Sequence, residues 1–447
     1  MKTEFDVIVI GSGVGGSGVA SSLAKAGKQV AVIEESLWGG TCPNRGCDPK
    51  KVLVSAVEAR DSASQLQGKG LHSIPEINWP DLMAFKETFT DPVPEQSKKK
   101  LADAGIETFS GSAEFIDEHT LQVNGNKLTA DQFVIATGAR PSLLDIPGKE
   151  HFLTSDDFLS LQEMPETVTF IGGGYIAFEF AAIANAAGAK VHLIHHNDRP
   201  LKAFDSELVQ QLMAELENKG VTIHLNIETS NLTKNGDSYV LSDDKGFELD
   251  TDLVFCSTGR IPNADNLQLE KAGVEFDKKG ITVNDYLQTS NSHIFALGDV
   301  LAKKQPKLTP VSTFEANYLV AYLTGETQES IAYPLISSQI FSGPKLAQIG
   351  VTTQEAQENP AKYEITTTDA ANYFSYTRKN EPVSTVKVIT DKESNLILGA
   401  ACLNNEADEL INYFHALIDH QVTATELSQK ILGYPTIASD LEYFYPK

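Results

Sequence analysis

Two of the chain's four cysteines, Cys42 and Cys47, lie close together in the segment GGTCPNRGCDPKK. Asp48 suits the N-cap and Pro49 the first position of a helix, so we expect a helix to begin at Pro49. The dipole of that helix would favour the thiolate of Cys47, and Lys50 adds a positive charge in the first turn. A zinc site would need further ligands, and none follows at finger-like spacing. The segment therefore predicts a redox-active dithiol, with a buried pair of free thiols as the alternative.

The segment FDVIVIGSGVGGSGVASSLAKAGKQVAVIEE has the pattern of a dinucleotide cradle. A buried strand, a glycine-rich turn, a helix that ends at Gly27 and a second buried strand follow one another. The turn has the G-x-G-x-x-G spacing, which lets the backbone approach a pyrophosphate at a helix N-terminus. A carboxylate closes the second strand, where it can bind ribose hydroxyls. The predicted cofactor-binding residues are Gly11, Gly13, Val14, Gly15, Gly16 and Glu34.

The same pattern returns in the segment TVTFIGGGYIAFEFAAIANAAGAKVHLIHHNDRPLK, with Gly172, Gly174 and Ala177 at the three positions of the fingerprint. Its second strand ends in histidines instead of a carboxylate. An acid there would repel a ribose 2′-phosphate and basic groups would attract it, so this cradle is predicted to favour NADP(H). NAD(H) is the alternative, because neutral histidines also suit a solvated strand end. The residues concerned are His195, His196, Arg199 and Lys202. Two cradles in one chain predict two nucleotides that exchange electrons.

Length and charge restrict the classes of protein. With 447 residues the chain is long enough for about three domains. The net charge of −24 argues against nucleic acid and against an anionic membrane as partner, because both would repel it. The first strand is expected from Phe5, which leaves no room for a signal peptide, and no apolar run is long enough to span a bilayer. We therefore expect the protein in the cytoplasm, where a disulfide is more often catalytic than structural.

Taken together, these segments resemble the pyridine nucleotide-disulfide oxidoreductases, the group that contains glutathione reductase, lipoamide dehydrogenase and mercuric reductase. The resemblance covers nearly the whole chain and rests on GSGVGG, GGTCPNRGC, PKK, ATGARP, GGGYIAFE, STGRIPN, ALGDV and KLTPV. It implies an α/β fold with two Rossmann-like domains, for FAD and NAD(P), and a C-terminal α+β dimerisation domain that forms a homodimer. The implied segments are 1–150 (FAD), 151–263 (NAD(P)), 264–330 (FAD again) and 331–447 (dimerisation).

The resemblance also implies roles for individual residues. Cys47 would be the flavin-side thiol, and Cys42 would attack the substrate. Lys50 would lie near the flavin ring, paired with Glu179, and Tyr175 would cover the nicotinamide pocket. Without the resemblance, Lys50 and Glu179 would be a capping lysine and a surface acid. Further residues implied to bind the cofactors are Gly40, Thr41, Ala113, Thr137, Gly138, Ile176, Gly259, Asp299 and Thr309.

One motif departs from the family pattern. Disulfide reductases of this family carry a catalytic histidine before a proline, with a glutamate five residues later, whereas this chain has Tyr434 before Pro435 and Ser439 at the glutamate position. Tyrosine titrates near pH 10, and general acid–base assistance is typically worth about 10²- to 10⁴-fold. The enzyme therefore uses a disulfide with an easy leaving group, a modified relay of Tyr434 with Asp440 or water, or another kind of acceptor. Tyr434 could equally serve interface packing alone.

The leading hypothesis is a glutathione-reductase-like enzyme that passes electrons from NADPH through FAD and the Cys42–Cys47 disulfide to a small disulfide. The alternative is a flavin-dependent reductase of a quinone, a metal ion or oxygen, and a third hypothesis is a redox-sensing scaffold without turnover. No metal cofactor is expected. The other two cysteines, Cys256 and Cys402, lie in apolar segments and are predicted to be buried thiols.

Overall fold

A computed structural model gives the structure of the chain and describes residues 2–445. The chain forms two compact units, each built from three separate stretches of sequence. The first unit comprises the chain up to Val52, Ala84–Ser142 and Gly259–Tyr333. The second comprises Leu53–Met83, Leu143–Thr258 and the chain from Pro334 onward. The four-segment division drawn from the sequence stays a prediction. Among residues 2–445, no helix combines the length and the apolar character needed to cross a membrane.

The strands of the first unit are β1 (Glu4–Ile10), β2 (Val30–Glu34), β3 (Glu107–Ser110), β4 (Ala113–Asp117), β5 (Thr120–Val123), β6 (Asn126–Ile135), β7 (Ala139–Pro141), β15 (Arg260–Pro262), β16 (Phe276–Asp277), β17 (Gly280–Ile281) and β18 (Ile294–Ala296). Its helices are α1 (Val14–Lys25), α2 (Thr41–Arg45), α5 (Val93–Asp103) and α9 (Thr309–Leu323), with the 3-10 turns η2 (Asp265–Leu267), η3 (Leu269–Ala272) and η4 (Gly298–Val300). Two further helices, α3 (Cys47–Gln65) and α4 (Trp79–Thr90), contribute residues to both units.

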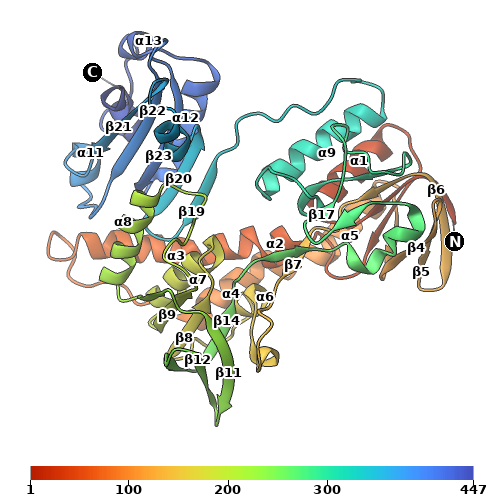
Figure 1. The fold of residues 1–447 in the computed structure, drawn as a ribbon, viewed down its shortest axis with the longest axis horizontal. Helices are drawn as coiled ribbons and strands as arrows, with labels where there is room; N and C mark the ends of the chain where they lie inside the picture. The colour runs from red at the N-terminus through yellow and green to blue at the C-terminus, as the bar shows by residue number, and fades with distance from the viewer. Residues whose placement is uncertain (1, 446–447) are drawn as a thin grey trace. The chain divides into compact units, whose positions relative to one another are not determined.

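A seven-stranded sheet forms the centre of the first unit. Its order is β3-β2-β1-β6-β5-β4, and β18 also pairs with β6. The strands β3, β2, β1, β6 and β18 run parallel, which requires crossover connections such as α1 between β1 and β2. The apolar runs of β1 and β2 are buried in the core, as expected for a parallel sheet covered on both faces. Figure 1 shows α1 and α9 side by side, so the first cradle is held between the sheet and two helices.

The structure corrects the predicted start of the helix after the cysteine pair. α3 begins at Cys47, two residues before Pro49, and Cys42 lies in the short helix α2 instead of an open loop. The two helices are separated by Gly46 alone, whose φ of −138° and ψ of −114° lie outside the helical region. Asp48 is therefore an acidic residue of the first turn and not the N-cap. The correction places Cys47 at the first position of the helix.

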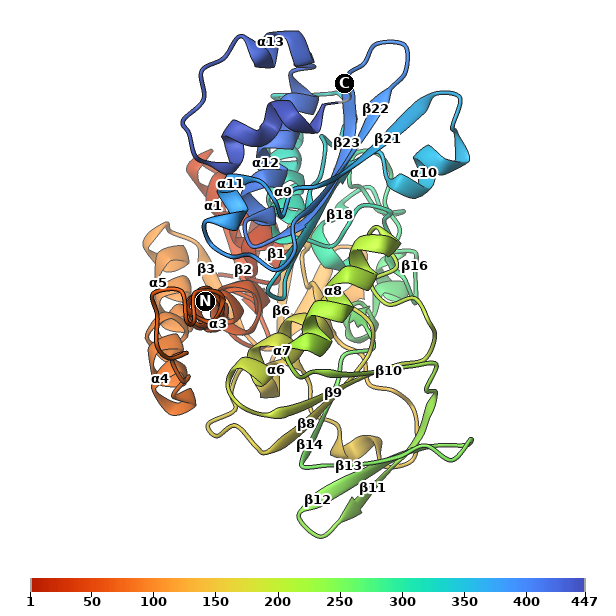
Figure 2. The same cartoon turned by 90° about the vertical axis from the view of Figure 1, so that its left-hand side faces the viewer.

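The second stretch of the second unit, Leu143–Thr258, contains the 3-10 turn η1 (Lys149–His151), α6 (Ser155–Phe158), β8 (Thr167–Ile171), α7 (Tyr175–Ala186), β9 (Lys190–His195), α8 (Ser206–Asn218), β10 (Thr222–Leu225), β11 (Thr229–Asn235), β12 (Ser238–Asp243), β13 (Glu248–Thr251) and β14 (Leu253–Cys256). Its parallel sheet has the order β10-β9-β8-β14, and β11, β12 and β13 form an antiparallel sheet (Figure 2). The sequence β8, glycine turn, α7 and β9 confirms the strand–turn–helix–strand pattern predicted for the second cradle.

The C-terminal domain, from residue 334 onward, completes the second unit. It contains β19 (Ser338–Phe341), β20 (Lys345–Gly350), α10 (Thr353–Glu358), β21 (Tyr363–Asp369), α11 (Phe374–Thr377), β22 (Thr385–Asp391), β23 (Ile397–Asn404), α12 (Ala407–Asp419), α13 (Ala424–Ser428) and the 3-10 segment η5 (Ile437–Phe444). Its antiparallel sheet has the order β19-β20-β23-β22-β21, and α12 packs on β20 and β23.

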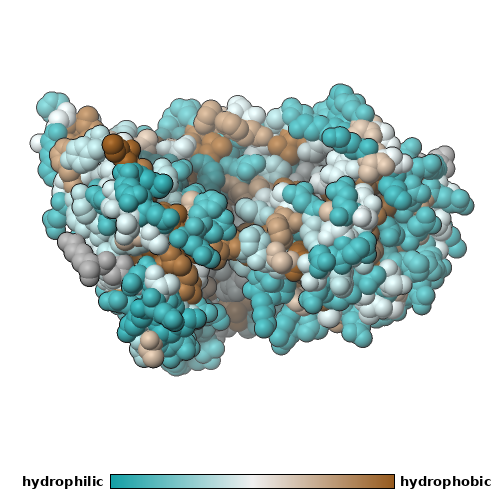
Figure 3. All heavy atoms as spheres, turned by 90° about the horizontal axis from the view of Figure 1, so that it is seen from above, coloured by the Kyte–Doolittle hydropathy of each residue, from teal (hydrophilic) through white to brown (hydrophobic). Residues whose placement is uncertain are grey.

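Hydrophilic residues cover most of the face in Figure 3, which agrees with the net charge of −24.

Candidate active site

The first cradle depends on a close approach between the glycine turn and the segment before α2. Gly40 has a φ of +73°, and a Cβ at this position would lie 2.4 Å from the Cα of Gly13. Gly13 is the N-cap of α1 and brings no side chain over the first-turn N–H groups, so these donors are available to an anion. Val14, Gly15 and Gly16 form the first turn of α1, and Gly11 lies just before it.

Glu34 lies at the end of β2 as predicted, and its carboxylate is almost completely buried. One oxygen accepts hydrogen bonds from the backbone N–H of Ser12, at 2.9 Å, and from the Ser12 hydroxyl, at 2.7 Å. The other accepts from the N–H of Ser36, at 2.9 Å. These bonds fix the glycine turn against the second strand. That Glu34 also binds a ribose stays a prediction.

The two cysteines of the candidate site differ in acidity. The pKa of Cys47 is lowered to about 6, first by its interaction with the neighbouring Cys42 thiol. The Thr309 hydroxyl, 3.4 Å from the Cys47 sulfur, and the charge of Lys50 lower the pKa further, and burial partly opposes them. The pKa of Cys42 is raised by the same interaction and by burial, and its thiol also lies 4.0 Å from the Asp48 carboxylate. Cys47 is therefore the thiolate of the pair at neutral pH, and Cys42 carries the proton.

The other predicted FAD residues of the first unit lie on several elements. Thr137 follows β6, and its hydroxyl donates to the carbonyl of Asn263 at 2.6 Å, while the Asn263 amide donates to the Thr137 carbonyl at 2.9 Å. A Cβ at Gly138 or at Gly259 would meet nothing within 4 Å, so space is open beside both. The remaining positions begin elements or lie in turns: Thr41 begins α2, Ala113 begins β4, Thr309 begins α9 and Asp299 lies in η4.

A buried polar network beside Asp299 was not predicted from the sequence. Glu315 in α9 is fully buried, and its carboxylate accepts from the N–H of Gly298 at 2.7 Å and from the Tyr333 hydroxyl at 2.7 Å. Lys303 pairs with the same carboxylate at 2.5 Å. This network fixes the turn that carries Asp299. The only signal in the sequence was a single acid in an otherwise weakly polar helix, which is common on surfaces.

The four basic residues predicted to favour a 2′-phosphate in the second cradle differ in their burial. His195 is buried, packs against Gly173 of the glycine turn and has a pKa lowered by burial. His196, Arg199 and Lys202 are exposed. A neutral imidazole inside the fold cannot supply a charge to a ligand, so only the other three remain as candidates to contact a 2′-phosphate. This is a difference from the expectation, in which all four acted together.

The glycine turn of the second cradle fits a nucleotide. Gly172 has a φ of +132°, and a Cβ there would lie 2.3 Å from the carbonyl oxygen of Ser257, so the turn needs glycine. A Cβ at Gly174, the N-cap of α7, would meet nothing within 4 Å, which leaves space over the helix N-terminus. Tyr175 begins α7 and is 43% exposed, and Ile176 next to it is half-buried.

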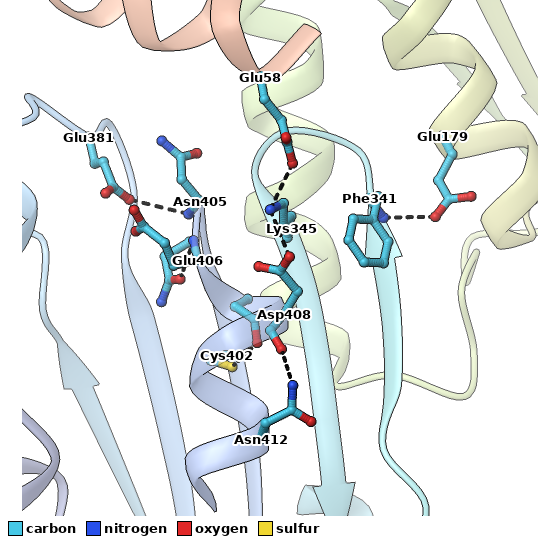
Figure 4. A network of polar contacts seen from close by, with 12 residues as sticks. Glu58, Glu179, Phe341, Lys345, Glu381, Cys402, Asn405, Glu406, Asp408 and Asn412 are labelled. Carbon is cyan, nitrogen blue, oxygen red and sulfur yellow. Dashed lines mark hydrogen bonds and ion pairs between the residues drawn. The ribbon is translucent and has the colours of Figure 1, made fainter. Parts of the chain in front are cut away.

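Glu179 is buried in α7 and is not a surface acid. Its carboxylate accepts a hydrogen bond from the backbone N–H of Phe341 in β19, at 2.8 Å, as Figure 4 shows. In the same view, Lys345 lies between Glu58, at 2.7 Å, and Asp408, at 2.9 Å. Glu179 belongs to the second unit and Lys50 to the first, so their pairing stays a prediction.

Tyr434 presents its ring to solvent in the C-terminal domain. The side chain is 71% exposed and stacks on Phe374, with ring centroids 6.3 Å apart. Ser439, at the position of the family's glutamate, forms a capping box with Thr436 at the start of η5. Asp440 is buried, and burial raises its pKa. Ser439 is thus occupied in a helix cap, which leaves Tyr434 without the carboxylate partner that the family motif provides at this position.

Comparison with known proteins decides the family. The sequence profile of the pyridine nucleotide-disulphide oxidoreductases matches residues 5–316, and the profile of the dimerisation domain of that group matches residues 336–443. The chain belongs to the pyridine nucleotide-disulphide oxidoreductases. It is 30% identical over 457 residues to a glutathione reductase of Nostoc sp., which covers 98% of this chain and 99% of that protein.

Two further members of the family show how the likeness extends. A mercuric reductase of Staphylococcus aureus is 30% identical over 451 residues, which cover 98% of this chain and 81% of that protein. The Cu(II) complex of the HOCl-induced flavoprotein disulfide reductase RclA from Escherichia coli matches with a TM-score of 0.90 and 26% identity, over 99% of both chains. These findings confirm the predicted resemblance, the α/β fold class with its C-terminal dimerisation domain, and the prediction of an oxidoreductase.

The family implies FAD and a nicotinamide nucleotide, and the residues present fit both groups. The first cradle would hold FAD, with the pyrophosphate at the open N-terminus of α1. The second would hold NAD(P)H, with open space over Gly174. Among residues 2–445, no three His, Cys, Asp or Glu side chains gather in a way that could hold a metal ion.

Proposed function

We propose that this oxidoreductase uses NADPH to reduce a small disulfide through the Cys42–Cys47 pair. The observation that carries the proposal is the position of Cys47 at the first residue of α3, with its sulfur 3.4 Å from the Thr309 hydroxyl and with Cys42 in the adjoining helix α2. The lowered pKa of Cys47 and the raised pKa of Cys42 agree with a thiolate at Cys47 and a proton on Cys42. The preference for NADPH is supported by the exposed His196, Arg199 and Lys202, which follow a strand that ends in histidine and not in a carboxylate. When bound, FAD would take a hydride from NADPH and return the electron pair to the disulfide form of the pair.

Substrate reduction follows from the two thiols. Cys42 attacks one sulfur of the substrate RSSR while its proton passes to Cys47, and the substrate S–S bond breaks. The first leaving thiolate takes that proton from Cys47 and departs as RSH. Cys47, again a thiolate, attacks the sulfur of Cys42 in the mixed disulfide and expels the second thiolate. The second thiolate is protonated from outside the pair, so RSSR has gained two electrons and two protons, and the Cys42–Cys47 disulfide has formed.

Tyr434 is proposed to assist that last protonation. Its phenol is exposed, and the dimerisation domain supports a homodimer. A phenol can donate a hydrogen bond to a leaving thiolate, but phenols in general do not cycle protons near neutral pH as an imidazole does. The preferred substrate is therefore a disulfide whose thiol is acidic enough to leave with little help.

A metal ion is the second candidate acceptor. It is favoured by the Cu(II) complex of RclA and by the mercuric reductase relatives, together with the replacement of the family's catalytic histidine by Tyr434. Two Cu(II) ions would each take one electron from the pair, which would become a disulfide and release its proton. No leaving thiolate is formed in this reaction, so no general acid is required.

A screen of acceptors with purified, FAD-loaded enzyme tests these proposals. NADPH or NADH consumption would be measured with glutathione disulfide, other small disulfides, Cu(II), Hg(II), a quinone and oxygen. We expect a small disulfide to give the highest kcat/KM, activity to be lost in Cys42→Ser, and Cys402→Ala to behave as wild type because that buried thiol lies outside the pair. Turnover of a quinone or oxygen that persists in Cys42→Ser, with every disulfide inert, would overturn the proposal. Turnover of Cu(II) or Hg(II) that requires Cys42, with disulfides inert, would establish the second candidate instead.

A further inference from the structure

The loop between β9 and α8 carries the three exposed basic residues proposed to contact the 2′-phosphate. We call residues 196–204 the basic loop; it contains no helix or strand. It ends at Asp205, the N-cap of α8, whose carboxylate accepts from the N–H groups of Glu207, at 3.1 Å, and Leu208, at 3.0 Å. Because the loop has no regular backbone pairing of its own, its shape depends on contacts with its surroundings.

One contact fixes the basic loop to the glycine turn. The N–H of Leu201 donates to the carbonyl of Gly173 at 2.7 Å, and the Leu201 side chain is buried. Leu201 has a φ of +48°, a conformation that leucine rarely adopts, so its surroundings hold it there. The middle of the loop is therefore attached to the turn that faces the pyrophosphate.

The C-terminal domain contacts the end of the basic loop and the residues that follow it at the start of α8. The ammonium of Lys387, in β22, lies 3.0 and 3.1 Å from the two carboxylate oxygens of Asp205 and 2.7 Å from Glu207. The Lys387 and Asp205 side chains are only 5% and 3% exposed. Gln348, in β20, donates from its amide to the carbonyl of Ala203 at 2.5 Å. The end of the basic loop is thus held by two strands of the dimerisation domain.

The position of Lys387 needs a physical reason. It lies between two valines in the buried strand β22, TVKVITD, and burying an ion pair costs desolvation that its attraction does not always repay. A buried charge pair of fixed geometry does, however, hold two segments in a single register. Lys387 itself is unsuited to contact a ligand, because it is buried and occupied by two carboxylates.

We propose that Lys387 and Gln348 are positioning residues that set the basic loop for recognition of the NADPH 2′-phosphate. The C-terminal domain would then determine coenzyme specificity as well as dimerisation. The inference rests on the proposed preference for NADPH. Hydrogen bonds from arginine and lysine to a phosphate depend on placement within about 1 Å, so loosening the loop weakens phosphate contacts and leaves the rest of the nucleotide site unchanged.

Binding of nucleotide fragments to the oxidised, FAD-loaded enzyme tests the proposal without turnover. Isothermal titration calorimetry would compare 2′,5′-ADP with 5′-ADP, which lacks the 2′-phosphate. For Lys387→Met we expect about tenfold weaker binding of 2′,5′-ADP and a change within about twofold for 5′-ADP. Gln348→Leu should also weaken the binding of 2′,5′-ADP relative to 5′-ADP, by a smaller factor. The matched control is Lys392→Met, because Lys392 is an exposed lysine of the same domain whose ammonium binds the carbonyl of Pro360.

A double variant controls for loss of folding. Lys387→Met leaves Asp205 as an unpaired buried charge, whereas Lys387→Met with Asp205→Asn removes both charges and keeps a residue that can cap α8. Melting temperature and bound flavin would show that each variant is folded. If wild type discriminates between the fragments and the folded variants keep its ratio, this inference is overturned and the preference for NADPH stands. If wild type binds both fragments equally, the preference for NADPH fails, and this inference fails with it.

Discussion

The shared proton of the cysteine pair can be tested by removing its donor. The pKa of Cys47 is about 6, against an ordinary 9.0, and the largest cause is its interaction with the Cys42 thiol. Because the pKa is lowered, the Cys47 thiolate is present above pH 6 and is lost as the pH falls through that value. Cys42→Ala removes the donor, so we expect the midpoint of Cys47 reactivity to move to higher pH. Thr309→Val and Lys50→Met should move it less, because they remove smaller causes.

The size of the effect can be worked out at pH 6. With a pKa of about 6 roughly half of Cys47 is thiolate, whereas at 9.0 the fraction is about 0.1%, a loss of about 500-fold. A thiolate of higher pKa is also the better nucleophile, with a Brønsted coefficient of about 0.45, and this returns about twentyfold. The alkylation rate of Cys47 in Cys42→Ala should therefore fall by up to about twentyfold at pH 6, with a smaller loss at higher pH.

The assay is iodoacetamide alkylation of the reduced enzyme between pH 5 and 9, with each labelled cysteine identified by mass spectrometry. Cys402 serves as an internal control, because it is fully buried and its pKa is raised by burial. In wild type we expect Cys47 to react first, with a midpoint near pH 6. A midpoint that stays near 6 in Cys42→Ala, or faster labelling of Cys42 than of Cys47 in wild type at pH 6, would refute the assignment of the thiolate.

Three further predictions concern flavin binding, stability and the acceptor. Gly40→Ala should yield protein without flavin absorbance, because a Cβ would lie 2.4 Å from the Cα of Gly13, whereas Gly18→Ala, with ordinary contacts at 3.7 Å, should retain it. Glu315→Leu should lower the free energy of unfolding in urea by about 3–5 kcal/mol, because it leaves Lys303 buried without its partner; an unchanged midpoint would contradict this. Tyr434→His should raise the turnover of a disulfide by about tenfold or more and make that turnover depend on pH near 6.5, where histidine titrates. Turnover of Cu(II) should not change, and equal effects on both acceptors would contradict the role of Tyr434.

The turns, helices and cysteines of the candidate site could be predicted where neighbouring residues in the sequence determine their structure. Both glycine turns, the helices after them and the buried thiols Cys256 and Cys402 lie where the sequence placed them. The start of α3 was predicted two residues late, because Asp48 and Pro49 suit a helix start in isolation. The pattern gave no weight to Gly46, which ends α2 directly before Cys47. Local signals therefore located the helix but not its first residue.

Features that depend on distant partners were not predictable. His195 looked equivalent to His196 in the sequence, but only the structure shows that it packs against Gly173 and is withdrawn from solvent. Lys387 received no prediction from the sequence, and its partner Asp205 lies 182 residues away in the chain. Neither contact leaves a trace in residue spacing, because the partners come from different strands and loops.

The proton balance links the cysteine pair to the choice of acceptor. Reduction of a disulfide consumes two protons, and the pair can supply only the one held between Cys42 and Cys47. The second must come from a group outside the pair, which is the task of the family's histidine and which we propose for Tyr434 or water in this chain. Reduction of two Cu(II) ions consumes no proton, because the pair releases the one it holds. We therefore expect a pair that keeps one proton, in a chain with an exposed tyrosine and a capped serine in place of the family's histidine and carboxylate, to favour acceptors with acidic thiols or with no thiol at all.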